Sequence, residues 1–149
     1  MLRAPDRASA ARAKGMEPAM KSGQRLLYAG MKAIVVEDCP ETSRLCRRFL
    51  EEHGLAVKQV NRGVAGLVEV RKERPDLVLI GFQLRDVSGF EAVSWLKADP
   101  ALCLVPVIVI CASTLPAEDL MLRRSGIGAV LRKPVSAETL ARAVCRVLG

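Results

Sequence analysis

Two adjacent carboxylates, Glu37 and Asp38, and a distant lysine, Lys133, are the side chains of this sequence best suited to chemistry. Each follows an apolar, β-branched run, AIVV before Glu37 and AVL before Arg132-Lys133. Paired carboxylates can hold a hard divalent cation such as Mg²⁺, and a lysine beside them can meet a phosphoryl oxygen. The same residues could equally form an ordinary surface ion cluster, and spacing alone leaves both interpretations open.

The stretch LVLIGFQLRDVSGF, residues 77–90, places a glycine where a functional side chain would be expected. Its apolar run ends at Gly81, and the following loop contains Asp86, Ser88 and Gly89. In an open α/β protein, the site is formed at the carboxyl ends of the strands. Cys111 ends another apolar run, PVIVI, so its thiol should reach the same edge. By itself, Gly81 would mark only a bulge or a close backbone approach.

Five apolar runs that alternate with segments of helical spacing should position these residues. We expect strands at 32–36, 56–60, 77–80, 105–110 and 129–131, and helices at 40–53, 64–72, 90–97, 116–124 and 137–148. Continuous rather than alternating runs are typical of strands buried on both faces of a parallel sheet. The order predicts one doubly wound (βα)5 domain of the α/β class. Apolar residues mark the inner faces of the first and last helices; they are Leu45, Phe49 and Leu50, and Leu140, Val144, Val147 and Leu148.

Charge and composition limit the remaining possibilities. Residues 1–30 carry six basic and two acidic residues, more than half of the net charge of +7. We expect them to be a basic, disordered N-terminal extension before a domain over 31–149, with nucleic acid or anionic lipid binding as the alternative. The five aromatic residues leave little material for base stacking, so a nucleic-acid partner is not expected.

Cysteine usage and hydropathy point to a compartment. Five cysteines without a CxxC pair predict reduced, mostly buried thiols. No apolar run approaches the length of a membrane span, and the N-terminus has no apolar signal core. We therefore predict a cytoplasmic protein that has no membrane partner.

Four motifs, taken in order, resemble those of the receiver domain of two-component response regulators. They are Glu37-Asp38 after the first strand, LVLIGFQLRDVSG after the third, PVIVICAS at the fourth and LRKP after the fifth. The match covers residues 31–148, and the order and spacing make it far more specific than any single motif. The resemblance implies a flavodoxin-like sheet of five parallel strands in the order 2-1-3-4-5. It also implies a signalling module rather than an enzyme, acting with a histidine kinase, a phosphotransferase or a downstream target.

Several positions match the family residue by residue. The resemblance makes Glu37 and Asp38 the acidic pair that holds Mg²⁺, and Gln83 the residue whose backbone carbonyl completes the metal site. Lys133 matches the lysine that contacts the phosphoryl group, and Pro134 a proline that is usually in cis. Because only two carboxylates remain, we expect weak Mg²⁺ binding at most and no required cofactor. Lys133 should then pair with Asp38 or Glu37.

Other positions depart from the family together. Gly81 stands where the family has its phosphoacceptor aspartate, Cys111 where it has a hydroxyl, and Val130 where an aromatic switch residue turns inward. Arg85 replaces a common proline of the loop. Glycine offers no atom to phosphorylate, a thiol donates poorly, and valine has no ring to move. The joint loss predicts a stand-alone, degenerate receiver that acts as a protein-interaction module without phosphorylation at Gly81.

Two other functions remain open. A substitute acceptor, Asp86, Ser88 or Asp38, would preserve phosphorylation, although Asp and Ser in such a loop are more often turn formers. Cys111 could instead sense redox state, although a thiol of the core is the simpler interpretation. Arginines could bind a nucleotide messenger, although cations at helix ends are the simpler interpretation. No nucleophile–base pair for another kind of enzyme is found, because the sole histidine, His53, should lie at the surface or at a helix end.

Basic residues late in the sequence mark the expected partner face. In the family this face comprises the fourth helix, the fifth strand and the fifth helix. Here its arginines are Arg123, Arg124, Arg132, Arg142 and Arg146. The first helix offers a second basic face with Arg44, Arg47 and Arg48. An acidic partner surface would complement these charges; the chain itself is expected to be a monomer or a weak homodimer.

Overall fold

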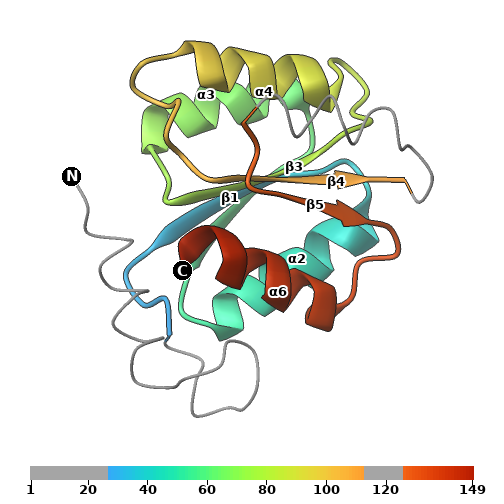
Figure 1. The fold of residues 1–149 in the computed structure, drawn as a ribbon. Helices are drawn as coiled ribbons and strands as arrows, with labels where there is room; N and C mark the ends of the chain where they lie inside the picture. Colours follow the sequence, from blue (N-terminus) through green and yellow to red (C-terminus); the bar gives the residue numbers. More distant parts are fainter. Residues whose placement is uncertain (1–26, 113–125) are drawn as a thin grey trace.

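Five parallel strands form the central sheet of the protein, whose computed structural model describes residues 27–112 and 126–149 (Figure 1). In chain order they are β1 Lys32–Val36, β2 Ala56–Val60, β3 Leu77–Gly81, β4 Val107–Cys111 and β5 Ala129–Arg132. Their spatial order is β2-β1-β3-β4-β5, which confirms the order that the resemblance implied. Every residue of β3 and β4 is buried, as expected for apolar strands covered on both faces.

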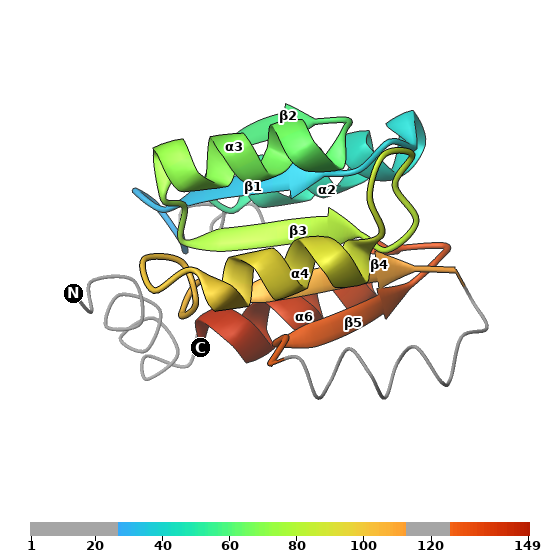
Figure 2. The same cartoon turned by 90° about the horizontal axis from the view of Figure 1, so that it is seen from above.

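Helices cover both faces of this sheet. Within the described residues, α3 Gly63–Glu73 and α4 Gly89–Ala98 lie on one face, and α2 Pro40–Glu52 and α6 Ala137–Leu148 lie on the other (Figures 1 and 2). Ser88 and Ser136 cap α4 and α6 with capping boxes, and Pro40 occupies the first turn of α2. The helix predicted at 116–124 lies outside the described residues. No described helix is long and apolar enough to cross a membrane.

Alternate side chains of the strands enter two separate hydrophobic clusters. Val35 and Leu79 pack on the side of α2 and α6, whereas Val36 and Ile80 pack on the side of α3 and α4. The second cluster depends on Gly66 of α3, because a Cβ there would lie 2.6 Å from Val36 Cγ2. The missing side chain therefore allows α3 to lie directly on β1.

The inner face of α2 is rotated relative to the sequence prediction. Phe49 is buried as expected, but Cys46 accompanies it, whereas the predicted Leu45 is only half-buried. His53 does lie at the helix end, as predicted, yet it is 6% exposed rather than at the surface. Its Nδ1 lies 2.8 Å from Phe49 O and its ring stacks on the Phe49 ring. Such a satisfied, buried imidazole has a structural role.

The start of β4 also differs from the sequence prediction. The strand begins at Val107 rather than at Val105. The Val105 N–H donates to Leu102 O at 3.0 Å in the preceding turn, and Pro106 has no N–H to donate to a ladder. The apolar run is therefore longer than the strand it contains.

The folded part of the chain begins before the predicted boundary at residue 31. Leu27 and Tyr28 are 6% and 1% exposed and belong to the core on the side of α2 and α6. The Tyr28 N–H donates to His53 O at 2.9 Å, which ties this segment to the end of α2. Residues 1–26, the rest of the predicted extension, lie outside the described residues.

Candidate functional site

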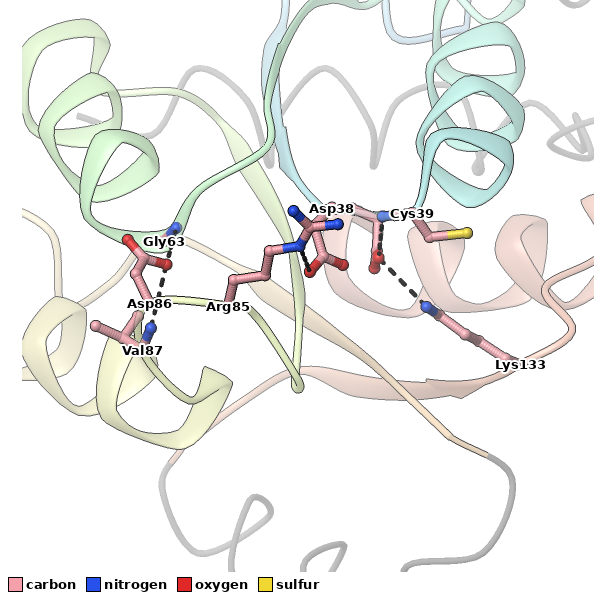
Figure 3. A network of polar contacts seen from close by, with 8 residues as sticks. Asp38, Cys39, Gly63, Arg85, Asp86, Val87 and Lys133 are labelled. Atoms are coloured by element: carbon pink, nitrogen blue, oxygen red, sulfur yellow. Dashed lines mark hydrogen bonds and ion pairs between the residues drawn. The ribbon is translucent and has the colours of Figure 1, made fainter.

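Glu37 places a buried carboxylate at the carboxyl edge of the sheet. It follows β1 directly and is 3% exposed. Its Oε2 accepts hydrogen bonds from the Cys39 N–H at 2.9 Å and from the Lys133 ammonium at 3.2 Å (Figure 3). Its Oε1 is buried and has no hydrogen-bond partner among the described residues. Because an unpaired buried charge is costly, Lys133 is needed to keep this carboxylate in place.

Gly81 lies beside the unpartnered oxygen. A Cβ built on Gly81 would be 2.7 Å from Glu37 Oε1 and 3.4 Å from Leu84 Cδ2. Side chains in protein interiors do not approach so closely without displacement. A side chain at position 81 would therefore require the Glu37 carboxylate to shift.

The loop after β5 brings Lys133 to the site. The Lys133 N–H donates to Cys111 O at 2.9 Å, and the Lys133–Pro134 peptide bond is cis, as the resemblance implied. Of the two pairings predicted for the ammonium, the structure contains the one with Glu37. The lysine side chain is 37% exposed, whereas that of Glu37 is 2% exposed, so the ammonium lies on the solvent side of a buried carboxylate.

Asp38 faces a different cation. Its Oδ2 lies 3.9 Å from Nε of Arg85, which belongs to the loop after β3 (Figure 3). Each carboxylate of the predicted metal pair thus already has a cation of the protein beside it. Among residues 27–112 and 126–149, no group of three His, Cys, Asp or Glu side chains could hold a metal. Mg²⁺ requires near-octahedral oxygen ligation, so this arrangement of charges does not fit a strong Mg²⁺ site.

The loop after β3 gives structural roles to two predicted substitute acceptors. Asp86 accepts hydrogen bonds from the N–H groups of Gly63 at 2.8 Å and Val64 at 3.0 Å, at the start of α3. These bonds, that of Val64 first, hold the pKa of the Asp86 carboxyl below its ordinary value. Ser88 Oγ accepts from the Glu91 N–H at 3.1 Å as the cap of α4. Both side chains therefore stabilise helix starts in this structure.

The same loop is closed by a tight backbone contact. Gln83, predicted to supply a carbonyl to the metal, is exposed and forms an isolated antiparallel bridge with Ser88. The Gly89 N–H donates to Phe82 O, and a Cβ on Gly89 would lie 2.5 Å from Phe82 Cα. Only glycine allows this approach, which explains the glycine at the end of the LVLIGFQLRDVSG motif.

The predicted hydroxyl and switch positions are filled by apolar packing. Cys111 ends β4 and is 3% exposed, which favours a small core residue over a reactive thiol. Val130 in β5 is half-buried and packs against the cluster beneath α3 and α4. Both positions therefore contribute to the core.

Cys39 is a residue of this site that the sequence interpretation did not single out. It is the half-buried N-cap of α2, and hydrogen bonds involving Thr42 lower the pKa of its thiol, with a smaller contribution from Lys133. By contrast, burial raises the pKa of Cys46 to about 12. None of the five cysteines forms a disulfide, and only Cys46 and Cys111 are buried, so the prediction of mostly buried thiols is wrong. The position of Cys39 directly before a helix-starting proline could have identified it.

The arginines of the expected partner face are only partly described. Arg123 and Arg124 lie outside the described residues. Arg142 and Arg146 are exposed on α6, and Arg132 is half-buried at the end of β5. An ion pair of 2.9 Å joins Arg142 to Glu138 one turn earlier. The described part of this face therefore has a basic but partly neutralised surface.

Comparison with known proteins agrees with this geometry. The profile of the response regulator receiver domain matches residues 33–145. The chain is 33% identical over 116 residues to the polar-differentiation response regulator DivK of Brucella anthropi, an alignment that covers 78% of this chain and 94% of that protein. The receiver domain of a Syntrophus aciditrophicus histidine kinase has a similar fold (TM-score 0.72, 27% identity, covering 80% of this chain and 90% of that chain). So does the chemotaxis response regulator CheY4 of Vibrio cholerae (TM-score 0.73, 23% identity, covering 78% of this chain and 98% of that chain). This chain therefore belongs to the response regulator receiver domain family.

Proposed function

We propose that this receiver domain is a protein-interaction module of two-component signalling that works without phosphorylation at Gly81. One observation carries the proposal: Glu37 Oε1 lies 2.7 Å from the position of a Cβ on residue 81. Glycine offers no oxygen for an acyl phosphate, and the neighbouring carboxylate already fills the adjoining space. The position that the resemblance assigns to the phosphoacceptor is therefore chemically inert.

The Glu37–Lys133 pair replaces the contact that a phosphoryl group would make. In the receiver resemblance, the lysine meets a phosphoryl oxygen; here its ammonium donates to a carboxylate oxygen at 3.2 Å. Both acceptors are anionic oxygens that form charge-assisted hydrogen bonds. The loop after β5 is consequently held by an internal ion pair, and its conformation does not depend on a kinase.

The other parts of the proposal concern partners and cofactors. Receiver domains interact with histidine kinases, phosphotransferases or effectors, and we assign this domain to the cytoplasm. Its partner face comprises the described arginines Arg132, Arg142 and Arg146 together with Arg123 and Arg124, and suits an acidic surface. No cofactor is required, and Mg²⁺ binds weakly because Glu37 and Asp38 already face cations.

Exposure to acetyl phosphate with Mg²⁺ tests the proposal. We expect intact-mass spectrometry to detect no phosphoryl adduct on the purified chain, whereas a receiver that has an aspartate acceptor is modified in parallel. A Gly81→Asp variant is the matched control, because it restores a carboxylate at the same position. An adduct mapped to Asp38, Asp86 or Ser88 in the wild-type chain would overturn the proposal.

A further inference from the structure

An apolar groove lies between α3 and α4, helices that run beside each other in Figure 2. Its volume is about 460 Å³. Val64, Val68 and Trp95 line it with side chains that are 46%, 58% and 52% exposed. Leu96 and Leu102, which are almost completely buried, form its floor. The groove therefore joins exposed apolar side chains to the core below them.

The gathering of these exposed side chains distinguishes the groove from ordinary surface. Of the four large hydrophobic residues exposed in the part of the chain that the structure describes, three line it, and the fourth is Leu104. Single exposed apolar residues are normal, whereas contiguous ones mark interaction sites. Packing of α3 on the sheet is achieved by the buried Val70 and the close approach of Gly66. The fold thus does not need Val64 and Val68 to be apolar.

An ion pair joins the two helices at the groove. Arg71 of α3 donates through Nη2 and Nε to Asp99 Oδ2, at 3.1 and 3.4 Å. The Ala101 N–H and Arg71 together lower the pKa of Asp99, which therefore stays ionised at neutral pH. The pair links α3 to the C-terminal end of α4, so the groove is a built feature of the surface.

Positive charge accumulates at the C-terminal end of α3. Lys72 and Arg74 are exposed, and neither forms an ion pair with another described residue. The acidic residues of the helix instead pair with lysines of the sheet: Glu69 with Lys58 at 2.9 Å, and Glu73 with Lys58 at 3.5 Å and Lys32 at 3.6 Å. The groove therefore adjoins exposed basic charge without a close ion-pair partner in the described chain, which an acidic group of a partner would complement.

We propose that this groove docks one amphipathic helix of a partner protein. Apolar side chains spaced by three or four residues would enter between α3 and α4, and acidic residues at one end would meet Arg71, Lys72 and Arg74. The size favours a helix over a second copy of the chain, because a stable dimer buries about 800 Å² per partner. Three half-exposed side chains supply only a few hundred Å². The surface is separate from α6, which covers the opposite face of the sheet (Figure 1).

A displayed library of amphipathic helices, about four turns long, tests this proposal. The library fixes a leucine stripe and randomises the polar positions among Glu, Lys and Gln. We expect enrichment of helices with glutamates near one end. Trp95 is the sole tryptophan and is half-exposed in the groove, so the selected peptides should shift its emission to shorter wavelength. Absence of enrichment, or enrichment of basic helices, would overturn the proposal.

Two surface variants give the matched comparison. Val68→Glu places a charge in the groove and should weaken the selected peptides about tenfold or more. Leu104→Ser removes an apolar side chain that is 91% exposed and does not line the groove, and should leave their affinity unchanged. Circular dichroism confirms that both variants fold. Equal binding to Val68→Glu would refute the site.

Two further measurements decide between occupants. Sedimentation velocity at increasing concentration detects a second copy on the groove, and cosedimentation with phosphatidylglycerol vesicles detects a membrane surface. We expect neither association to depend on Val68. If Val68→Glu abolishes self-association or vesicle binding shown by the wild-type chain, a second copy or a membrane is the occupant and the proposal of a partner helix is wrong.

Discussion

A carboxylate at position 81 would directly perturb the arrangement of Glu37 and Lys133. In a Gly81→Asp variant, the new Cβ would lie 2.7 Å from Glu37 Oε1, so the Glu37 side chain must move. This movement weakens its hydrogen bonds from the Cys39 N–H and the Lys133 ammonium, now 2.9 and 3.2 Å long. The variant also brings a second negative charge beside a buried one. We expect both effects to lower the free energy of unfolding.

The two contributions have different sizes and can be separated. Displacing the hydrogen-bonded carboxylate should cost about 1–3 kcal/mol, and Gly81→Ala carries this steric contribution alone. Two carboxylates about 4 Å apart repel by about 4 kcal/mol at an effective dielectric constant of about 20. Lys133 attracts both and offsets part of that repulsion. Gly81→Asp should therefore be about 2 kcal/mol less stable than Gly81→Ala.

Urea denaturation at neutral pH, with and without millimolar Mg²⁺, measures these differences. Three carboxylates should bind Mg²⁺ better than two, so the ion should restore most of the electrostatic loss in Gly81→Asp. It should leave the wild-type chain and Gly81→Ala nearly unchanged. The reasoning is refuted if the Asp and Ala variants are equally stable, or if Mg²⁺ stabilises the wild-type chain as much as Gly81→Asp.

The same variant separates phosphorylation from switching. Gly81→Asp should accept a phosphoryl group from acetyl phosphate, because it regains the nucleophile beside Lys133. It should not undergo the conformational response that the receiver resemblance implies, because Cys111 and Val130 supply neither the hydroxyl nor the aromatic ring expected at those positions. Amide chemical shifts of β5 before and after phosphorylation give the measurement; large shifts there would contradict the expectation.

Three further perturbations test individual contacts. The pKa of Asp86 is lowered in the folded protein, so its contribution to stability is present above the ordinary value of 3.8 and is lost as pH falls through the lower folded value. Asp86→Asn should therefore reduce the loss of urea stability on acidification, and an unchanged acid slope would contradict this. Iodoacetamide should alkylate Cys39 well before Cys46, because the pKa of Cys39 is lowered and that of Cys46 is raised to about 12. Peptide mass spectrometry measures the order of alkylation, and the reverse order would contradict the thiol environments described. Gly66→Ala should lower the free energy of unfolding by about 1–3 kcal/mol, because its Cβ would lie 2.6 Å from Val36 Cγ2. Thermal unfolding measures this loss. A loss below about 0.5 kcal/mol would show that α3 can move away from β1.

Local patterns predicted most of the fold. The apolar runs identified all five strands, and the helical spacing between them predicted α2, α3, α4 and α6. The patterns were less reliable where a contact is not local. The core contribution of Tyr28 rests on packing with α2 and α6, and the rotation of α2 brought Cys46 rather than Leu45 inward. Neither fact is contained in the spacing of neighbouring residues.

The sequence by itself determined which residues gather at the carboxyl edge of the sheet, because strand order and motif spacing place the ends of β1, β3, β4 and β5 together. It left open whether Lys133 pairs with Glu37 or Asp38. Only the tertiary structure decided that, since Glu37 and Lys133 are 96 positions apart. The tertiary structure also decided that Asp86 binds the start of α3 across 23 positions. It likewise placed Trp95 beside α3 to form the groove. Each depends on the distance between packed elements, which a linear pattern does not contain.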